Sequence, residues 1–398
     1  MANWESFEAF LREAEAAPVE ERQAIVDDLL RERLDWPWIQ GNKASFIYVS
    51  MGAKRVALNL DTFDGDPPFA QMQKLEGTTL WHLTSEFEDD DLLDYLLAID
   101  DPMTPLKTER DIIGRIERHW RVDPLNTTRM NTAQMNVSVL RMANARPFPD
   151  WTKLYQVKHG KLREHFISSV QLGFANRKVW VYTPPEYDEN PNEIYPLMIF
   201  ADGQWSIGPL QIPQMADALI KHGRMQPVII AMVQSGDQKD RIKTYVSNDR
   251  HYSFLLTELL PFLQTQYRLD SANLGVGGVA VGAIAAAHAA LKNPAVFSHL
   301  IMISPPLGRG VAQEKLSQYA KRFEDATVLP KRIFQSVGRY ETRSRFYLPA
   351  QVLHTILEER DDVEYQYIEI GSGHGLVAFR AVLPEALAWA FPGEVWER

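Results

Sequence analysis

The sequence predicts an α/β domain with a mostly parallel sheet and helices on both faces, preceded by a small Ig-like β-sandwich and N-terminal helices. Three successive patterns along the 398 residues predict this fold. Apolar residues first recur at helical spacing, then alternate with polar residues, and finally form buried strands that alternate with helices. We therefore expect a helical segment at 1–36, a β-sandwich domain at 37–135 and an α/β domain at 136–398.

Residues 4 to about 34 have the spacing of amphipathic helices. Apolar side chains recur every three or four residues in two runs, and Pro18 separates the runs. The first run contains Phe7, Phe10, Leu11 and Ala14, and the second contains Ile25, Leu29 and Leu30. This pattern predicts one or two helices, each with one buried face.

From about Ser45 to Tyr95 the period changes to two. The segments FIYVSM, RVALNL and TTLWHLTSEF are short and rich in β-branched and aromatic residues, as is typical of strands. Turn-rich stretches such as DTFDGDPP separate them. Several short strands with turn signals between them predict a small β-sandwich.

Beyond Met130, strand and helix signals alternate. Strands are expected at 136–142, 178–182, 196–202, 227–233, 274–277, 299–304, 332–337 and 364–370. Helices are expected at 212–222, 252–267, 281–291, 348–359 and 376–390. Because the central strands are apolar on both faces, we expect a mostly parallel sheet that helices cover on both sides.

Composition narrows the function classes. The chain has no cysteine, which excludes disulfides, thiolate catalysis and Cys-based metal sites, and we expect no cofactor and no metal. A net charge of −10 argues against a nucleic-acid partner. The arginines at 339, 343 and 345 are a local exception, either a solvated loop or an anion-binding group. The N-terminus lacks the pattern of a signal peptide, and no apolar run is long enough to span a bilayer, so we expect a cytoplasmic protein without a membrane partner.

Gly278 to Gly282 read G-V-A-V-G, between a predicted strand and a predicted helix of small residues. This is the spacing of the G-x-S-x-G nucleophile elbow of α/β-hydrolases, in which the central residue sits in a strained turn and its neighbours lack bulk. The first N–H groups of the following helix would suit a developing oxyanion. The central residue here is Ala280, which has no hydroxyl. Close packing of a strand against a helix is the plainer interpretation of such a turn.

Two further loops carry candidate catalytic residues. His374 lies between two glycines after the last predicted strand, where the general base of this architecture belongs. Glu341 follows the preceding strand, so 280, 341 and 374 have the chain order of nucleophile, acid and histidine. Glu341 could instead pair with a neighbouring arginine. Ser304 and Ser372 are weaker candidates for the nucleophile because no elbow surrounds them.

These segments resemble the enterobactin (enterochelin) esterase family, in the esterase D branch of the α/β-hydrolases. LEGTTLWHLTSEF followed by DPLN resembles the N-terminal β-sandwich of that family, and RKVWVYTPPEY and YPLMIFADGQWSIG resemble its early hydrolase strands. ELLPFLQTQY, the elbow, KNPAVFSHLIMIS and SGHG then follow in the expected order. The resemblance implies hydrolysis of a carboxylic ester in a small-molecule siderophore that carries iron.

The resemblance also implies a role for individual residues. Ala280 falls on the nucleophile, His374 on the base and Glu341 on an acidic or ligand-contacting position. The implied oxyanion hole consists of backbone N–H groups of Val281, Gly203 and Gln204. The implied ligand-binding residues are Asp202, Trp205, Arg241 and Arg339.

The sequence departs from the family pattern at four positions. Ala280 replaces the nucleophile, and Gly375 stands where an acidic residue usually follows the histidine. Thr244 stands where a glutamate usually follows Arg241 by three residues, and Val279 replaces a polar residue. Without a hydroxyl at the elbow, no acyl-enzyme forms there. Two explanations remain open: natural loss of hydrolysis, giving a binding or regulatory pseudoenzyme, or an active serine esterase whose serine was replaced.

A third hypothesis keeps the fold and changes the ligand. β-Sandwiches joined to esterase D-like domains also resemble feruloyl and acetyl esterases, whose sandwich is similar to a glycan-binding module. Trp81, Tyr95 and Trp120 would then stack on sugar rings. Alternatively, these three side chains are core or interdomain aromatics.

Overall fold

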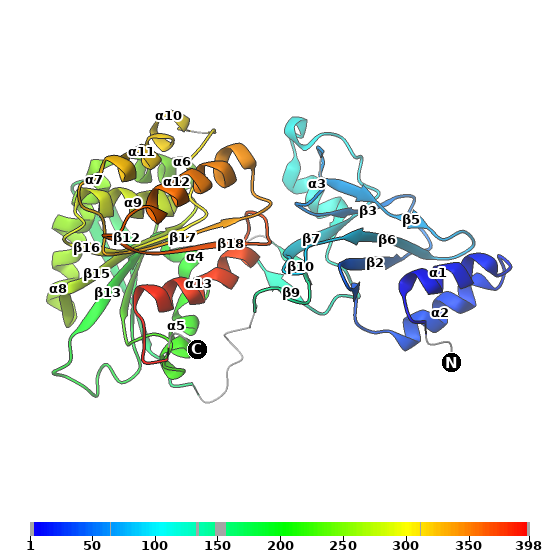
Figure 1. The fold of residues 1–398 in the computed structure, drawn as a ribbon, viewed down its shortest axis with the longest axis horizontal. Coiled ribbons are helices and arrows are strands. Elements are labelled where there is room, and N and C mark those ends of the chain that lie inside the picture. Colours follow the sequence, from blue (N-terminus) through cyan, green and yellow to red (C-terminus); the bar gives the residue numbers. More distant parts are fainter. Residues whose placement is uncertain (1–3, 64, 133–134, 148–156, 311, 396–398) are drawn as a thin grey trace. The chain divides into compact units, whose positions relative to one another are not determined.

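The computed structural model describes residues 4–63, 65–132, 135–147, 157–310 and 312–395, which form two compact units (Figure 1). The first unit comprises Met1–Arg146 and Gly371–Val377, and the second comprises Pro147–Ile370 and Ala378–Arg398. Each unit has its own sheets and its own core. No helix within the described ranges is long and apolar enough to cross a membrane.

The first unit begins with the two predicted helices, α1 (Phe7–Ala16) and α2 (Arg22–Glu32). Ser6 caps α1 because its hydroxyl accepts the Ala9 N–H at 3.0 Å. The apolar faces of both helices pack on the sandwich. Their shared core includes Phe7, Phe10, Val26, Leu29, Trp36, Trp38, Ile47 and Leu80. The helices therefore complete the core of the first unit.

The predicted β-sandwich consists of two sheets. One has the order β1 (Trp38–Gln40), β2 (Lys43–Val49), β6 (Leu80–Glu86) and β5 (Gln73–Lys74). The other has the order β4 (Phe69–Gln71), β3 (Val56–Asn59), β7 (Leu92–Ile99), β10 (Asn136–Arg141) and β9 (Arg129–Asn131), and β8 (Trp120–Arg121) also pairs with β7. A short 3-10 turn, Leu106–Thr108, and α3 (Ile112–His119) precede β8.

The position of β10 differs from our expectation that the α/β domain begins at residue 136. β10 pairs antiparallel with both β7 and β9, and four of its six residues are buried in the sandwich. It is therefore a sandwich strand, and the first unit continues to Arg146. A short apolar strand has the same local pattern in either domain, so only its pairing partners reveal where it belongs.

The aromatic residues considered as sugar platforms are part of the sandwich itself. Trp81 is 6% exposed and Tyr95 is 2% exposed, so neither ring presents a face for stacking. The Tyr95 hydroxyl donates to Asp123 Oδ2 at 2.7 Å and accepts from Asn126 Nδ2 at 3.0 Å. The half-buried Trp120 packs edge-on against Phe69. The glycan-platform interpretation is therefore wrong for Trp81 and Tyr95.

The second unit is built on an eight-stranded sheet with the order β11-β12-β14-β13-β15-β16-β17-β18 (Figure 1). The strands are β11 (Lys161–Ser169), β12 (Phe174–Thr183), β13 (Tyr195–Phe200), β14 (Ile229–Val233), β15 (Leu269–Val279), β16 (Phe297–Ile303), β17 (Arg332–Gly338) and β18 (Glu364–Ile370). Pairing is antiparallel from β11 through β12 to β14 and parallel across the rest. The predicted parallel sheet is thus confirmed, with an antiparallel edge at β11 that the sequence pattern did not indicate.

Helices cover both faces of this sheet. In Figure 1, α5 (Ile212–Lys221) and α13 (Leu376–Ala390) lie below the sheet, and α9 (Val281–Lys292) and α12 (Leu348–Glu358) lie above it. The other helices are α4 (Gly203–Ile207), α6 (Gln238–Tyr245), α7 (Asp249–Phe254), α8 (Leu260–Gln266), α10 (Gln313–Leu316) and α11 (Gln318–Asp325). π-Helical turns at Leu255–Leu259 and Arg343–Tyr347 lead into α8 and α12. The central strands and the Ala-rich α9 form one continuous core.

Candidate active site

Three residues of the second unit that lie just after the end of a strand have a positive φ angle, in the left-handed region. Asp202 follows β13 with φ 58°, Ala280 follows β15 with φ 50°, and Ser304 follows β16 with φ 49°. Because β13, β15 and β16 are adjacent and parallel, these residues share the carboxyl edge of the sheet. Non-glycine residues in this conformation cost about 1–3 kcal/mol each and gather at functional sites. This edge is the candidate active site.

Ala280 lies in a tight turn that has the spacing of a nucleophile elbow. Its backbone (φ 50°, ψ −122°) turns β15 sharply into α9, and its N–H donates to the Ile303 carbonyl at 2.8 Å. A Cβ on Gly278 would lie 2.5 Å from the Gly282 carbonyl oxygen and 2.7 Å from the Ala283 nitrogen. Gly278 therefore permits the turn to close, as the G-x-A-x-G spacing predicts. The elbow presents a methyl group where a nucleophile would stand.

The three predicted oxyanion donors lie at the starts of helices. Val281 begins α9, and the first N–H groups of a helix have no acceptor within that helix. Gly203 begins α4, and a Cβ there would lie 2.5 Å from the Met232 carbonyl oxygen, so only glycine fits. The Gln204 side chain is occupied, because its Nε2 donates to Ser235 Oγ at 2.7 Å and its Oε1 accepts the Ser235 N–H at 3.1 Å. Only the backbone of Gln204 suits the predicted role.

Asp202 and Arg241 form a bidentate ion pair. Arg241 Nε donates to Asp202 Oδ1 at 2.8 Å and Nη2 donates to Oδ2 at 2.7 Å, with the side chains 15% and 8% exposed. Burial opposes the charge of Arg241, yet the Asp202 carboxylate outweighs it and the pKa of Arg241 is raised. A Cβ on Gly282 would lie 3.0 Å from Asp202 Oδ2, so this carboxylate packs against the first turn of α9. Arg241 therefore neutralises a negative charge that would repel an anion at the elbow.

Glu341 links the carboxyl ends of β16 and β17 through hydrogen bonds. It is 3% exposed, and its Oε1 accepts from Ser304 Oγ at 2.6 Å and from the Gly338 N–H at 2.8 Å. The sequence did not indicate this partner of Glu341, because Ser304 was predicted only as a weak candidate for the nucleophile. The Ser304 hydroxyl is therefore buried and donates to a carboxylate.

The remaining predicted ligand residues of the second unit have separate neighbours. Trp205, in α4, is 37% exposed. Arg339 donates from Nε to Glu369 Oε1 at 3.1 Å. The Arg343 guanidinium lies over the Tyr347 ring at 5.5 Å, and the Arg345 guanidinium lies 5.4 Å from the Phe346 ring. Their role in anion binding stays a prediction.

The loop that carries His374 belongs to the first unit. The Gly371 carbonyl accepts the Leu92 N–H at 2.7 Å, and His374 itself is exposed. Carboxylates approach both neighbouring glycines, because a Cβ on Gly375 would lie 3.2 Å from Asp94 Oδ1 and one on Gly373 would collide with Asp61. Burial, with the charge of Asp61, raises the pKa of Asp94 to about 6. The predicted partnership of His374 with position 280 stays a prediction.

Two family models match the chain. Residues 174–390 match the family model "Putative esterase", and residues 50–151 match the model "Enterochelin esterase, N-terminal". The first of these models covers more than half of the chain. The chain belongs to this esterase family. No curated protein matches its sequence.

Solved esterase structures share the fold. Enterobactin esterase from Shigella flexneri in the presence of enterobactin has a TM-score of 0.72 and 18% identity, over 92% of this chain and 97% of that chain. Ferric enterobactin esterase from Salmonella typhimurium has a TM-score of 0.74 and 18% identity, over 92% of this chain and 98% of that chain. A ferulic acid esterase has a TM-score of 0.50 and 17% identity, over 58% of this chain and 98% of that chain.

The predicted family and the predicted fold are therefore confirmed. This esterase keeps the elbow turn, the small residues that let it close and the helix starts around it. At this turn Ala280 carries a methyl group and no hydroxyl. The retained arrangement suits binding of a carbonyl group and charge stabilisation near the α9 terminus.

Proposed function

We propose that this esterase-family protein is a pseudoenzyme, which binds a small siderophore-like ester and does not hydrolyse it through an acyl-enzyme. One observation carries the proposal. Ala280 keeps the strained elbow conformation, with φ 50° and ψ −122°, while presenting only a methyl group. The strained backbone serves no chemical purpose at an alanine, so the residues packed around Ala280 must impose this conformation.

The serine hydroxyls at this edge of the sheet serve other purposes. Ser304 Oγ donates to Glu341, Ser206 Oγ donates to the Asp202 carbonyl at 3.2 Å, and Ser235 Oγ accepts from Gln204. All three serines are buried, with exposed fractions of 2%, 0% and 7% in that order. A buried hydroxyl that already holds a structural hydrogen bond is poorly placed to attack an ester. These serines therefore do not replace the missing nucleophile.

The ligand class is proposed by analogy with the structural neighbours. The Shigella flexneri enzyme was crystallised in the presence of enterobactin, of 2,3-dihydroxy-N-benzoyl-glycine and of 2,3-dihydroxy-N-benzoyl-serine. We propose a related ester for this chain, with any iron present as cargo. In this proposal Glu341 supports the site, and residue 280 has no alcohol proton for a general base to remove. Oxyanion stabilisation and binding alone leave about 10³–10⁴-fold catalysis over water in a serine protease that lacks its triad.

The test is to measure binding and turnover of enterobactin in the same samples. We expect saturable quenching of tryptophan fluorescence, with no release of 2,3-dihydroxybenzoylserine above the protein-free rate by liquid chromatography and mass spectrometry. A denatured sample and an unrelated protein of similar charge serve as controls. Turnover at an ordinary enzymatic rate, about 1–10³ s⁻¹, would contradict the proposal.

A second candidate, an active serine esterase whose serine was replaced by Ala280, makes the opposite prediction for one variant. If the Ala280→Ser protein shows burst kinetics and a covalent acyl adduct on that serine, the remaining machinery is catalytically competent. If the variant folds and stays inert, loss of activity extends beyond residue 280. The departures at Val279, Thr244 and Gly375 favour the inert outcome.

A further inference from the structure

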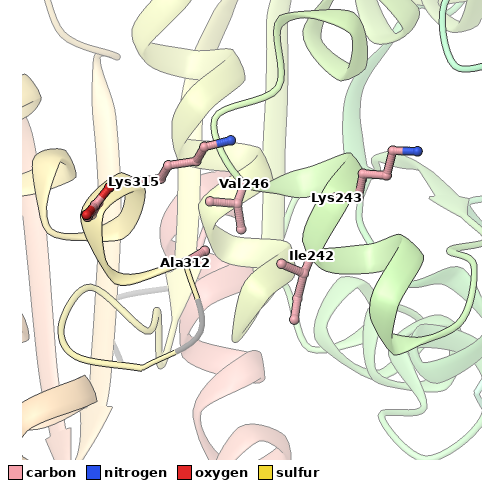
Figure 2. Close-up of a pocket in the computed structure, with 6 residues that line it drawn as sticks. Ile242, Lys243, Val246, Ala312 and Lys315 are labelled. Atoms are coloured by element: carbon pink, nitrogen blue, oxygen red, sulfur yellow. The ribbon is translucent and has the colours of Figure 1, made fainter.

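A cavity of about 590 Å³ lies in the second unit between α6 and the α10 segment (Figure 2). Ile242, Lys243 and Val246 line it from α6 and the residue that follows α6. Ala312, Glu314 and Lys315 line it from α10 and the turn before α10. Its volume falls in the range of small-molecule sites, about 300–1,000 Å³.

The lining of this cavity is apolar at its base and cationic at its rim. Figure 2 shows Lys315 on one side of the cavity and Lys243 on the other, with Val246 between the two chains and Ile242 and Ala312 lower in this view. Both lysines are exposed, and within the ranges that the structure describes neither ammonium has a carboxylate at ion-pair distance. Glu314 is the one acidic residue among the six, so the lining carries a net charge of +1.

The cavity shares α6 with the candidate active site. Arg241, one residue before Ile242, holds the Asp202 carboxylate beside the elbow helix. α6 also packs against α9, the helix that starts at the elbow. A molecule in the cavity would therefore contact the same helix that neutralises Asp202.

We propose that this cavity binds an amphipathic anion. Its flat aromatic or acyl body packs on Ile242, Val246 and Ala312, and its carboxylate or phenolate lies between the two lysines. A hydroxyl or amide N–H on the same molecule donates to Glu314, the acidic residue of the lining. The inference rests on the proposed function, because such an anion forms one part of a siderophore-like ester and this cavity would hold that part.

The test uses two probes of the same shape, N-benzoylglycine and its neutral amide, in calorimetric titrations of the full chain. We expect the acid to bind at least about threefold more tightly than the amide. Lys243→Gln and Lys315→Gln should each weaken the acid about two- to fivefold, as expected for an exposed charge pair, and leave the amide unchanged. Lys239→Gln is the matched control, because Lys239 is exposed on α6 and does not line the cavity. Ala312→Leu, which fills part of the cavity, should weaken both probes.

Several outcomes would overturn the inference. These are equal affinity for acid and amide, lysine variants that bind as tightly as the parent, or no binding of the acid at millimolar concentration. If the chain binds enterobactin and the lysine variants bind it unchanged, the cavity assignment fails and the proposed function stands. If the acid binds in a lysine-dependent way and enterobactin does not bind, the proposed function fails and the cavity assignment stands.

Discussion

The elbow geometry predicts a large effect of adding one methyl group to Gly278. A Cβ at this position would lie 2.5 Å from the Gly282 carbonyl oxygen and 2.7 Å from the Ala283 nitrogen. Ordinary contacts of a Cβ begin at 3.4 Å, and the Gly282 carbonyl carbon is nearer still, so the first turn of α9 must move by about 1 Å. Both opposing atoms belong to the backbone, so no side-chain rotation relieves the overlap.

We expect Gly278→Ala to destabilise the second unit by about 2–3 kcal/mol. Overpacking a rigid site costs about 1–3 kcal/mol, and this site lies at the upper end because backbone must move. Reduced freedom of the unfolded chain offsets about 0.4–1 kcal/mol. For a unit of about 240 residues, the melting temperature should fall by about 4–12 °C.

Scanning calorimetry of the parent and two further variants tests this expectation. Gly282→Ala should cost less, because its nearest neighbours are the Ala201 and Asp202 side chains at 3.0 Å. Gly52→Ala is the control, because no atom lies within 4 Å of its Cβ position. A Gly278→Ala protein that melts with the parent, or an equal loss in all three variants, would refute the steric reasoning.

Two further predictions concern buried charges. Arg241→Met leaves the Asp202 carboxylate buried without its partner, so we expect the free energy of unfolding in urea to fall by about 3–5 kcal/mol. The double variant with Asp202→Asn should lose less stability than the sum of the two single variants. Additive losses would show that the two side chains are not coupled. Burial, with smaller effects of His288 and Arg177, lowers the pKa of His251 to about 3. The unfolded chain takes up this proton near pH 6.5 and the folded chain only near pH 3, so this contribution to stability is complete above pH 6.5 and falls by about 2 kcal/mol by pH 5. His251→Phe should remove that part of the pH dependence in urea titrations at pH 7.5 and 5.0, and an unchanged dependence would contradict the assignment.

The order of elements in the second unit was predictable because each central strand is an apolar run bounded by turn signals. The elbow was predictable because the turn from β15 into α9 leaves no room for a Cβ at Gly278, and the G-x-A-x-G spacing is visible in five consecutive residues. Features that depend on contacts between residues close in sequence, such as the elbow turn, could therefore be predicted from the sequence.

Pairings between distant residues could not be predicted in this way. Asp202 and Arg241 are 39 residues apart, and Ser304 and Glu341 are 37 apart. Each pair forms only because parallel strands bring their exits to one edge of the sheet. β10 and the edge strand β11 were misplaced or missed for a related reason, since their hydrogen-bond partners decide their place in the fold. The positive φ of Asp202 and Ser304 likewise reflects tertiary constraint.

The central claim, that the elbow is intact and Ala280 prevents formation of an acyl-enzyme, is tested most directly by intact-protein mass spectrometry after incubation with p-nitrophenyl acetate. We expect the parent protein to keep its unmodified mass and to show no burst of p-nitrophenol. A stoichiometric acetyl adduct on the parent protein, located on a hydroxyl residue at the carboxyl edge of the second-unit sheet, would contradict it.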